Sequence, residues 1–272
     1  PANSNQVWLL YTEQGRAKLD IQTGSGNAGK WNREHTFPRS RGGFDDIEED
    51  EIADGVDVFW TTEADSLRHG NSDAHALRAA DAVENSTRGN QHYGQYIGPS
   101  GTLGSFRGDV ARSVLYMEIR YNGLEVVNGF PTTAGELGDL ATLLDWHRND
   151  PPDDFEMNRN NVVYTWQFNR NPFIDQPELV EYIWGNNVGD IWDQSLSLDE
   201  NELQGQYKFF LSKNNEDIIN SKTTNKNIKK ELHKIITKSL KSHKNSGYIK
   251  LAQSYDIWCC GKIFYDLIHC RN

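Results

Sequence analysis

The first 258 residues of the chain contain no cysteine, because Cys259, Cys260 and Cys270 all lie at its end. A disulfide framework therefore cannot support the main part of the fold. No apolar run approaches the roughly 20 residues of a transmembrane helix. Basic residues are also scarce, with 28 Lys and Arg against 39 Asp and Glu, so the formal net charge is −11. Taken alone, that charge argues against a broad basic surface for polyanions.

What the chain does contain divides into two unlike pieces. Its 272 residues are 36% hydrophobic and 11% aromatic, which is enough for a buried core. Residues 1–193 carry 15 basic and 31 acidic residues, a balance of −16, whereas residues 194–272 carry 13 and 8, a balance of +5. We therefore expect a folded domain over 1–193 and a separate Lys-, Asn- and Ile-rich tail over 194–272.

The hydrophobic pattern predicts short strands first and helices afterwards. Val7–Leu10 and Val56–Trp60 have the character of short strands in a turn-rich region. After residue 108 the apolar spacing is helical, and we expect four helices: 109–121 capped by Asp109, 137–150, one from 153 onward, and 177–185. This order predicts an α+β fold, mostly helical after residue 108.

Two local motifs resemble ligand loops but lack the residues that would complete them. The segment GSGNAGK, 24–30, is followed by Trp31 instead of a magnesium-binding hydroxyl and a helix start, so it predicts a turn. The stretch 44–65 holds ten acids and no base. It fails as a calcium loop because Ile52 and Thr61 occupy ligand positions, and it is typical of a solvated loop.

Two other segments carry residues suited to phosphodiester chemistry. WNREHTFPRS, 31–40, offers Glu34 and His35, and residues 72–90 offer Asp73, His75 and Asn85, with arginines in or near both. Oxygen ligands suit Mg²⁺, a neutral histidine suits a general base, and arginines suit phosphate oxygens. One geometric difficulty remains, because adjacent residues of a regular strand point to opposite faces. Glu34 and His35 can serve one site only at a strand end, at an irregularity, or at the strand's edge.

At these residues the sequence resembles the bacterial endonuclease I family of secreted or periplasmic nucleases with a ββα-metal (His-Me finger) site. Residues 31–38 resemble the E-H-x-x-P segment, and 72–75 with 85–90 resemble the S-D-x-H…N-x-x-R-[SG]-N segment. Residues 108–112 and the N-x-N-P-F block at 169–173 resemble later parts of the family. The likeness runs in order from about Val7 to Trp192.

The resemblance implies a non-specific endonuclease that hydrolyses DNA, with RNA as a further substrate, and leaves 5′-phosphates. His35 would be the general base, and Glu34 and Asn85 would hold one Mg²⁺ or a similar ion such as Mn²⁺ or Ca²⁺. An arginine would contact the scissile phosphate, with Arg68 the first candidate and Arg88 the second. Supporting roles fall to Asp73 and His75, which match the family motif and order the hairpin.

The resemblance also implies a hairpin of the His35 strand with a second strand around 74–78, followed by a helix around 81–88 that presents Asn85. We expect a secreted or periplasmic monomer with no membrane partner. The tail from Leu198 to Lys222 resembles the opening of a C-terminal sorting domain of the type IX secretion route, in a degenerate form. Two alternatives stay open: a phosphodiesterase for small substrates, which the acidic body favours, and an inactive, degenerate binding module.

Overall fold

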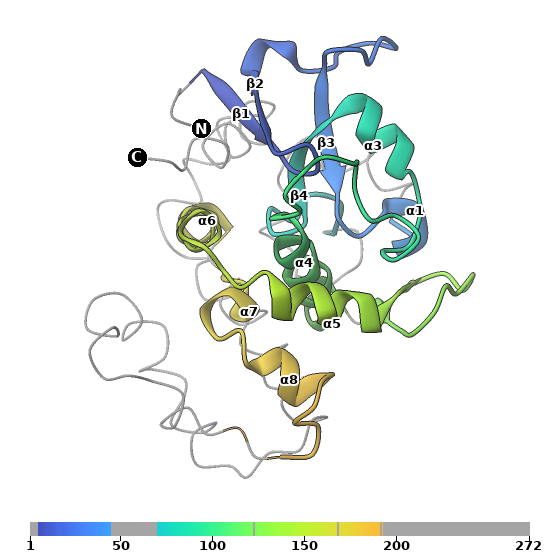
Figure 1. The fold of residues 1–272 in the computed structure, drawn as a ribbon, viewed down its shortest axis with the longest axis vertical. Coiled ribbons are helices and arrows are strands. Elements are labelled where there is room, and N and C mark those ends of the chain that lie inside the picture. Colours follow the sequence, from blue (N-terminus) through green and yellow to red (C-terminus); the bar gives the residue numbers. More distant parts are fainter. Residues whose placement is uncertain (1–4, 45–69, 122, 168, 191, 193–272) are drawn as a thin grey trace, which may run out of the picture.

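A computed structural model describes residues 5–44, 70–121, 123–167, 169–190 and 192 of the chain (Figure 1). Nearly all of the acidic stretch, the strand expected at 56–60, Arg68 and the 194–272 tail lie outside the described residues. The proposed boundary at 193 and the sorting-domain resemblance therefore stay predictions.

The described chain forms small sheets and several helices, as the α+β prediction requires. Three two-stranded sheets pair β1 with β2, β3 with β4 and β5 with β6; the strands are β1 Gln6–Leu9, β2 Gln14–Ala17, β3 Trp31–His35, β4 Leu77–Asp81, β5 Glu125–Val126 and β6 Glu136–Leu137. The helices are the short 3-10 helix η1 Lys18–Asp20, α1 Arg39–Gly42, α3 Ala82–Arg88, α4 Arg107–Arg120, α5 Leu140–Asn149, α6 Asp154–Gln167, α7 Pro172–Asp175 and α8 Leu179–Ile183.

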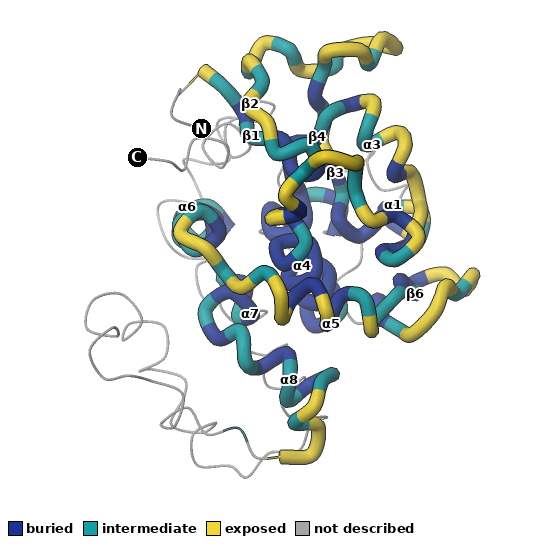
Figure 2. Tube along the Cα trace, in the orientation of Figure 1, coloured by how far each residue is buried: buried dark blue, intermediate teal, exposed yellow. Residues whose placement is uncertain are grey.

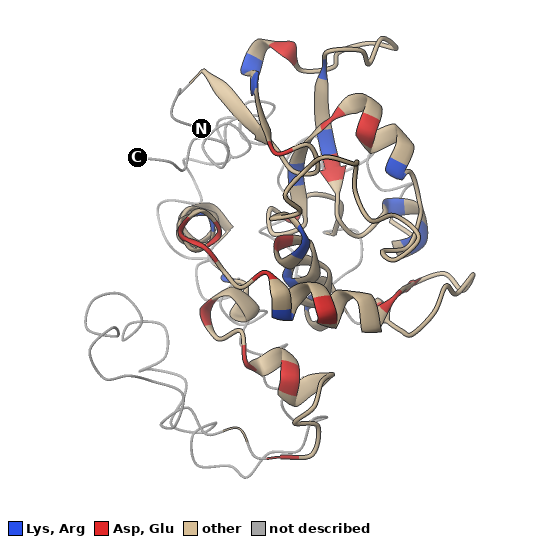
Figure 3. Ribbon diagram, in the orientation of Figure 1, with Lys and Arg blue, Asp and Glu red and all other residues tan. Residues whose placement is uncertain are grey.

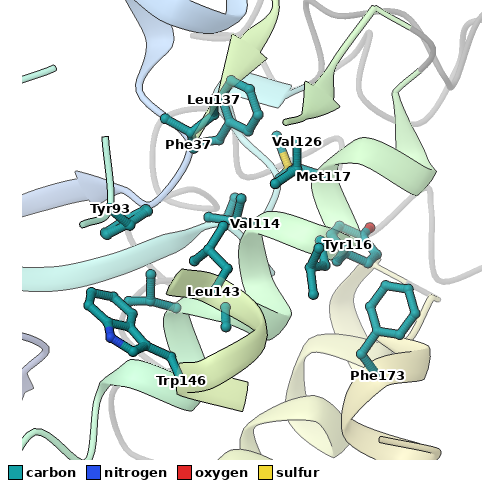
Figure 4. Close-up of a cluster of buried hydrophobic side chains, with 14 of the residues drawn as sticks. Phe37, Tyr93, Val114, Tyr116, Met117, Val126, Leu137, Leu143, Trp146 and Phe173 are labelled. Carbon is teal, nitrogen blue, oxygen red and sulfur yellow. The ribbon is translucent and has the colours of Figure 1, made fainter. Parts of the chain in front are cut away.

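Helix α4 forms the centre of the core. Its residues are buried on every side, which requires neighbours around its whole circumference (Figure 2). Val114 and Met117 of α4 lie among buried side chains from distant segments, including Phe37, Leu137 and Trp146 (Figure 4). The segment after β3 is thereby packed into the same core as α4 and α5, which fixes the end of that strand.

The predicted helices are present, with shifted boundaries. Helix α4 begins at Arg107, two residues before Asp109, and the Asp150 side chain accepts from the Gly108 N–H in its first turn (2.7 Å). Asp109 does not cap this helix, because its carboxylate forms an ion pair of 2.8 Å with Arg78 of β4. Leu137 belongs to β6, and α5 begins at Leu140 behind the side-chain cap of Asp139. Helix α7 was not predicted, although Asn171 caps it and Pro172 occupies its first turn.

The second strand of the hairpin begins later than expected. We placed it around 74–78, but β4 spans Leu77–Asp81, and residues 73–76 form a turn. The reason is local hydrogen bonding: the Asp73 side chain accepts from the His75 N–H (2.9 Å) and the Asp73 carbonyl accepts from the Ala76 N–H (3.0 Å). The prediction for the following helix is confirmed, since α3 spans Ala82–Arg88 with Asp81 as its cap.

The GSGNAGK segment is a turn, as predicted, and strand β3 follows it where a nucleotide-binding loop would need a helix. Within the residues that the structure describes, no helix is long and apolar enough to cross a membrane.

Candidate active site on the edge of strand β3

Strands β3 and β4 and helix α3 form a compact unit that positions the predicted site residues. The strands pair antiparallel, with Glu34 opposite Arg78 and His35 opposite Leu77. His35 is the last residue of β3, and the chain bends directly after it. The strand-end condition for Glu34 and His35 to serve one site is therefore met.

The backbone of β3 exposes one set of polar groups on the edge away from β4. Thr36 N–H donates to the Ala76 carbonyl and Ala82 N–H donates to the Lys30 carbonyl, both at 3.0 Å, so the even-numbered positions of this strand face β4. In an antiparallel ladder the alternate residues face outward. The carbonyl of Arg33 and the N–H of His35 therefore point to the outer edge.

Glu34 is buried at the foot of this edge, with 2% of the residue exposed. Its Oε1 accepts a hydrogen bond of 2.6 Å from the Tyr11 hydroxyl and lies 3.6 Å from Nε of Arg88, and the His35 N–H also donates to the carboxylate. Burial raises the pKa of Glu34, and these three partners act in the opposite direction. The bond from the His35 N–H brings this buried carboxylate to the outer edge of β3.

Asn85 reaches the same edge from α3. Its Nδ2 donates to Oδ1 of Asn32 (2.8 Å) and to the Arg33 carbonyl (3.1 Å). Asn32 is held in turn, because its Nδ2 donates to Oε1 of Gln22 (2.9 Å). Both hydrogens of the Asn85 amide are thus directed at β3, and its Oδ1 must point away from that strand.

The His35 imidazole is fixed by one backbone contact. Its Nε2 lies 2.9 Å from the carbonyl oxygen of Asn71. A carbonyl can only accept, so the neutral ring carries its proton on Nε2 and a lone pair on Nδ1. The pKa of His35 is lowered to about 4, mainly by burial and also by Arg39 and Arg33, while the Asn71 contact acts in the opposite direction. The ring is therefore neutral at pH 7, as a general base must be.

Arg88, the second candidate for the scissile phosphate, is 1% exposed. Its Nη2 donates to the Thr36 carbonyl and its Nη1 to the Gly89 carbonyl, both at 2.9 Å, and its guanidinium lies 4.9 Å from the centre of the Tyr93 ring. With Glu34 beside it, this side chain is committed to interior partners. The placement suits a residue that orients Glu34, and Arg68, the first candidate, lies outside the described residues.

Asp73 and His75 belong to a separate buried network. The Asp73 carboxylate, 3% exposed, accepts from the His75 N–H, Gln167 Nε2 (2.8 Å), the Tyr116 hydroxyl (3.0 Å) and the Tyr121 hydroxyl (2.7 Å). The network lies at the start of the hairpin and joins it to α4 and α6. These contacts give Asp73 and its neighbours a role in ordering the hairpin.

The His75 imidazole is part of this network. Its Nε2 lies 3.2 Å from the Asn169 carbonyl, and its ring packs on Tyr116. Burial lowers the pKa of His75 to about 4.

The structure thus brings the Glu34 carboxylate, the His35 backbone N–H and the Asn85 amide to one edge of β3, with the His35 ring at the end of that strand, and it places Asp73 and His75 in a separate network. It adds Asn32, Tyr11 and Asn71, which the sequence reasoning missed. Asn32 stands inside the WNREH segment and could have been noticed, whereas nothing in the sequence marked the Asn71 carbonyl or the Tyr11 hydroxyl.

The donors at this edge fit a hard divalent ion, which takes carboxylate and amide oxygens and keeps several waters. Glu34 supplies a carboxylate and Asn85 directs an amide oxygen away from the strand. Among the residues described, no group of three or more His, Cys, Asp or Glu side chains is arranged to hold a metal. A two-ligand site of this kind would not form such a group.

Comparisons with known proteins found one family model and two similar proteins. A model of the Endonuclease I family matches residues 1–105 and 103–178 of the chain. The extracellular ribonuclease of Bacillus amyloliquefaciens is 36% identical over 208 residues, and the extracellular ribonuclease of Bacillus subtilis (strain 168) is 34% identical over 208 residues. Each match covers 68% of this chain and 63% of the relative, so the chain spans less than two thirds of the length of these relatives.

Proposed function

The chain belongs to the endonuclease I family, and on that premise we propose that it is a metal-dependent endonuclease that hydrolyses phosphodiester bonds of DNA and RNA. The site is a ββα-metal (His-Me finger) unit built from β3, β4 and α3. The observation that supports the proposal is the outer edge of β3, where the His35 N–H donates to the buried Glu34 carboxylate and the Asn85 amide donates to the Arg33 carbonyl, with the neutral His35 ring at the end of the same strand.

His35 is the general base in this proposal. The Asn71 carbonyl holds the proton on Nε2, so the Nδ1 lone pair takes a proton from the attacking water. The oxygen of that water attacks phosphorus, the bond to the 3′ oxygen breaks, and the product keeps a 5′-phosphate. The lowered pKa keeps the ring ready to accept the proton at neutral pH.

Glu34 and Asn85 would hold one Mg²⁺ or a similar ion such as Mn²⁺ or Ca²⁺. When bound, such an ion supplies positive charge to the phosphate oxygens and to the departing 3′ oxygen. Arg88 and Tyr11 then keep the Glu34 carboxylate in place, and Asn32 keeps the amide oxygen of Asn85 turned outward.

We infer the class of substrate and the location of the protein from the named relatives. Both similar proteins are named extracellular ribonucleases, so RNA stands beside DNA as a substrate and secretion is the expected location. Arginines lie on β3 and on α1, beside the proposed site (Figure 3). They offer local phosphate contacts on a chain whose overall charge is negative.

Cleavage of supercoiled plasmid and of RNA in Mg²⁺, with and without chelator, tests the proposal. We expect cleavage by the wild type, loss with chelator, and near-complete loss for His35→Ala. Asn85→Ala should need more Mg²⁺, and the exposed Asn149→Ala is a matched control that should behave as wild type. Undiminished cleavage by His35→Ala would overturn the mechanism.

Two other results would each favour an alternative. Cleavage of a small aryl phosphodiester without cleavage of plasmid or RNA would favour a small-substrate phosphodiesterase. Absence of both metal binding and cleavage would favour an inactive binding module.

A further inference from the structure

Phe130 is an exposed aromatic side chain on the surface of the described part of the chain. It is 51% exposed, and every other Phe, Tyr or Trp in the described part of the chain is less exposed. It lies in the segment between β5 and β6. Burial of a phenylalanine ring contributes about 1.5–3 kcal/mol, so a half-exposed ring on a surface loop forgoes part of that gain.

The Phe130 ring is held in a fixed orientation. It stacks on the imidazole of His92, with ring centres 5.7 Å apart and planes 29° apart. His92 is itself immobilised, since its Nδ1 accepts from the Gly138 N–H and its Nε2 lies against the Pro131 carbonyl, both at 2.9 Å. An added Cβ at Gly94 would lie 3.4 Å from the ring edge, so the ring also packs closely there. Because the ring is already ordered, a ligand that stacks on it would cause little further loss of side-chain entropy.

Arg41 ties this loop to the proposed active site. Its Nη1 donates to the Pro131 carbonyl (3.3 Å), its Nε donates to the Asn90 carbonyl, and its own carbonyl accepts from the Gly135 N–H (2.6 Å). Asn90 follows α3, which carries Asn85, and Arg41 lies on α1, six residues after His35. Six residues span at most about 20 Å, so Arg41 lies within about that distance of His35 along the chain.

We propose that the exposed face of Phe130 is a subsite that stacks one base of a single-stranded nucleic acid whose backbone is cleaved at His35. The inference rests on the proposed nuclease function. A duplex keeps its bases stacked on one another, whereas a single strand can offer a base face to an aromatic ring. The carboxylate of Asp139, which accepts from the Gly129 N–H (2.8 Å) beside this ring, disfavours a phosphate there and leaves the uncharged base as the ligand.

Binding tests the subsite directly, without turnover. In the His35→Ala background, the affinity for a single-stranded oligonucleotide carrying 2-aminopurine is measured by anisotropy and by quenching of the 2-aminopurine emission. Stacking on one aromatic ring corresponds to about a 5- to 150-fold change in affinity. We expect Phe130→Ala to lose affinity in this range together with the quenching, and Phe130→Trp to keep both. Leu103→Ala, which alters an equally apolar and 95% exposed side chain on another loop, should change neither.

Cleavage supplies the second readout. In the active protein, Phe130→Ala should lower the ratio of single-strand to duplex kcat/KM, mainly through KM for the single strand. If Phe130→Ala changed neither this kcat/KM ratio nor the affinity for the oligonucleotide, the subsite would be overturned. Cleavage by the wild type would in that case still support the nuclease function. If the wild type cleaves nothing, the proposed function fails; Phe130-dependent quenching would then still support the base-binding surface, and its absence would end both.

Discussion

Replacement of Arg88 by methionine should destabilise the protein strongly. The change removes the positive charge 3.6 Å from Glu34 and two guanidinium hydrogen bonds of 2.9 Å, at a side chain that is 1% exposed. The Thr36 carbonyl keeps a donor, the Tyr93 hydroxyl at 2.8 Å. The main cost is therefore the buried carboxylate left without its cation. Breaking such a pair costs about 3–5 kcal/mol, which for a domain of this size lowers Tm by about 6–20 °C.

Thermal unfolding followed by circular dichroism measures this effect. Glu34→Gln keeps the side-chain shape and removes the charge, so the double variant Glu34→Gln with Arg88→Met should lose less stability than the sum of the two single variants. The opposite pattern would refute the reasoning. If Arg88→Met kept the wild-type Tm and lost only kcat, Arg88 would act on the scissile phosphate and not on Glu34.

Three further outcomes are expected. Asn32→Ala should raise the Mg²⁺ concentration for half-maximal cleavage by about 10- to 100-fold, and Asn32→Asp, which keeps the acceptor for Asn85, should raise it less; equal values for both variants would contradict this. Burial lowers the pKa of His75 from 6.5 to about 4, so the unfolded chain binds more protons than the folded chain between these pH values. The contribution of His75 to stability is therefore complete above pH 6.5, and up to about 3 kcal/mol of it is lost as the pH falls to 4. Urea unfolding of His75→Gln should show a flatter dependence of the unfolding free energy on pH. Binding of DNA should weaken only gradually with salt because the domain is acidic, and a slope typical of many phosphate contacts would oppose this.

The sequence predicted the parts of the fold that depend on short-range signals. Apolar spacing located α4, α5 and α6, whereas α3 was expected from the family resemblance. The predicted helix boundaries were wrong where a residue contacts a partner that is distant in the sequence. Asp109 was expected to cap a helix, and it pairs with Arg78 on a distant strand. No local pattern reports such a partner.

The site was predictable in its residue types and not in its geometry. Glu34, His35 and Asn85 could be selected from motif resemblance, but their arrangement depends on the register of the strands and on which edge of β3 is not paired with β4. The supporting contacts are harder to foresee, because the Asn71 carbonyl belongs to the backbone and carries no sequence signal. The buried state of Arg88 was likewise invisible, since arginine is usually a surface residue.

The network at Asp73 has a consequence for when the hairpin can be completed during synthesis. One of its four donors comes from Gln167, 94 residues later in the chain, and the neighbouring His75 contacts the Asn169 carbonyl. Contacts of such sequence separation form late, because the loop between them must close first. The hairpin that carries His35 therefore completes its support only after residue 169 has been made. A nascent chain that already holds Glu34, His35 and Asn85 would still lack the contacts by which Gln167 and Asn169 support the turn before β4.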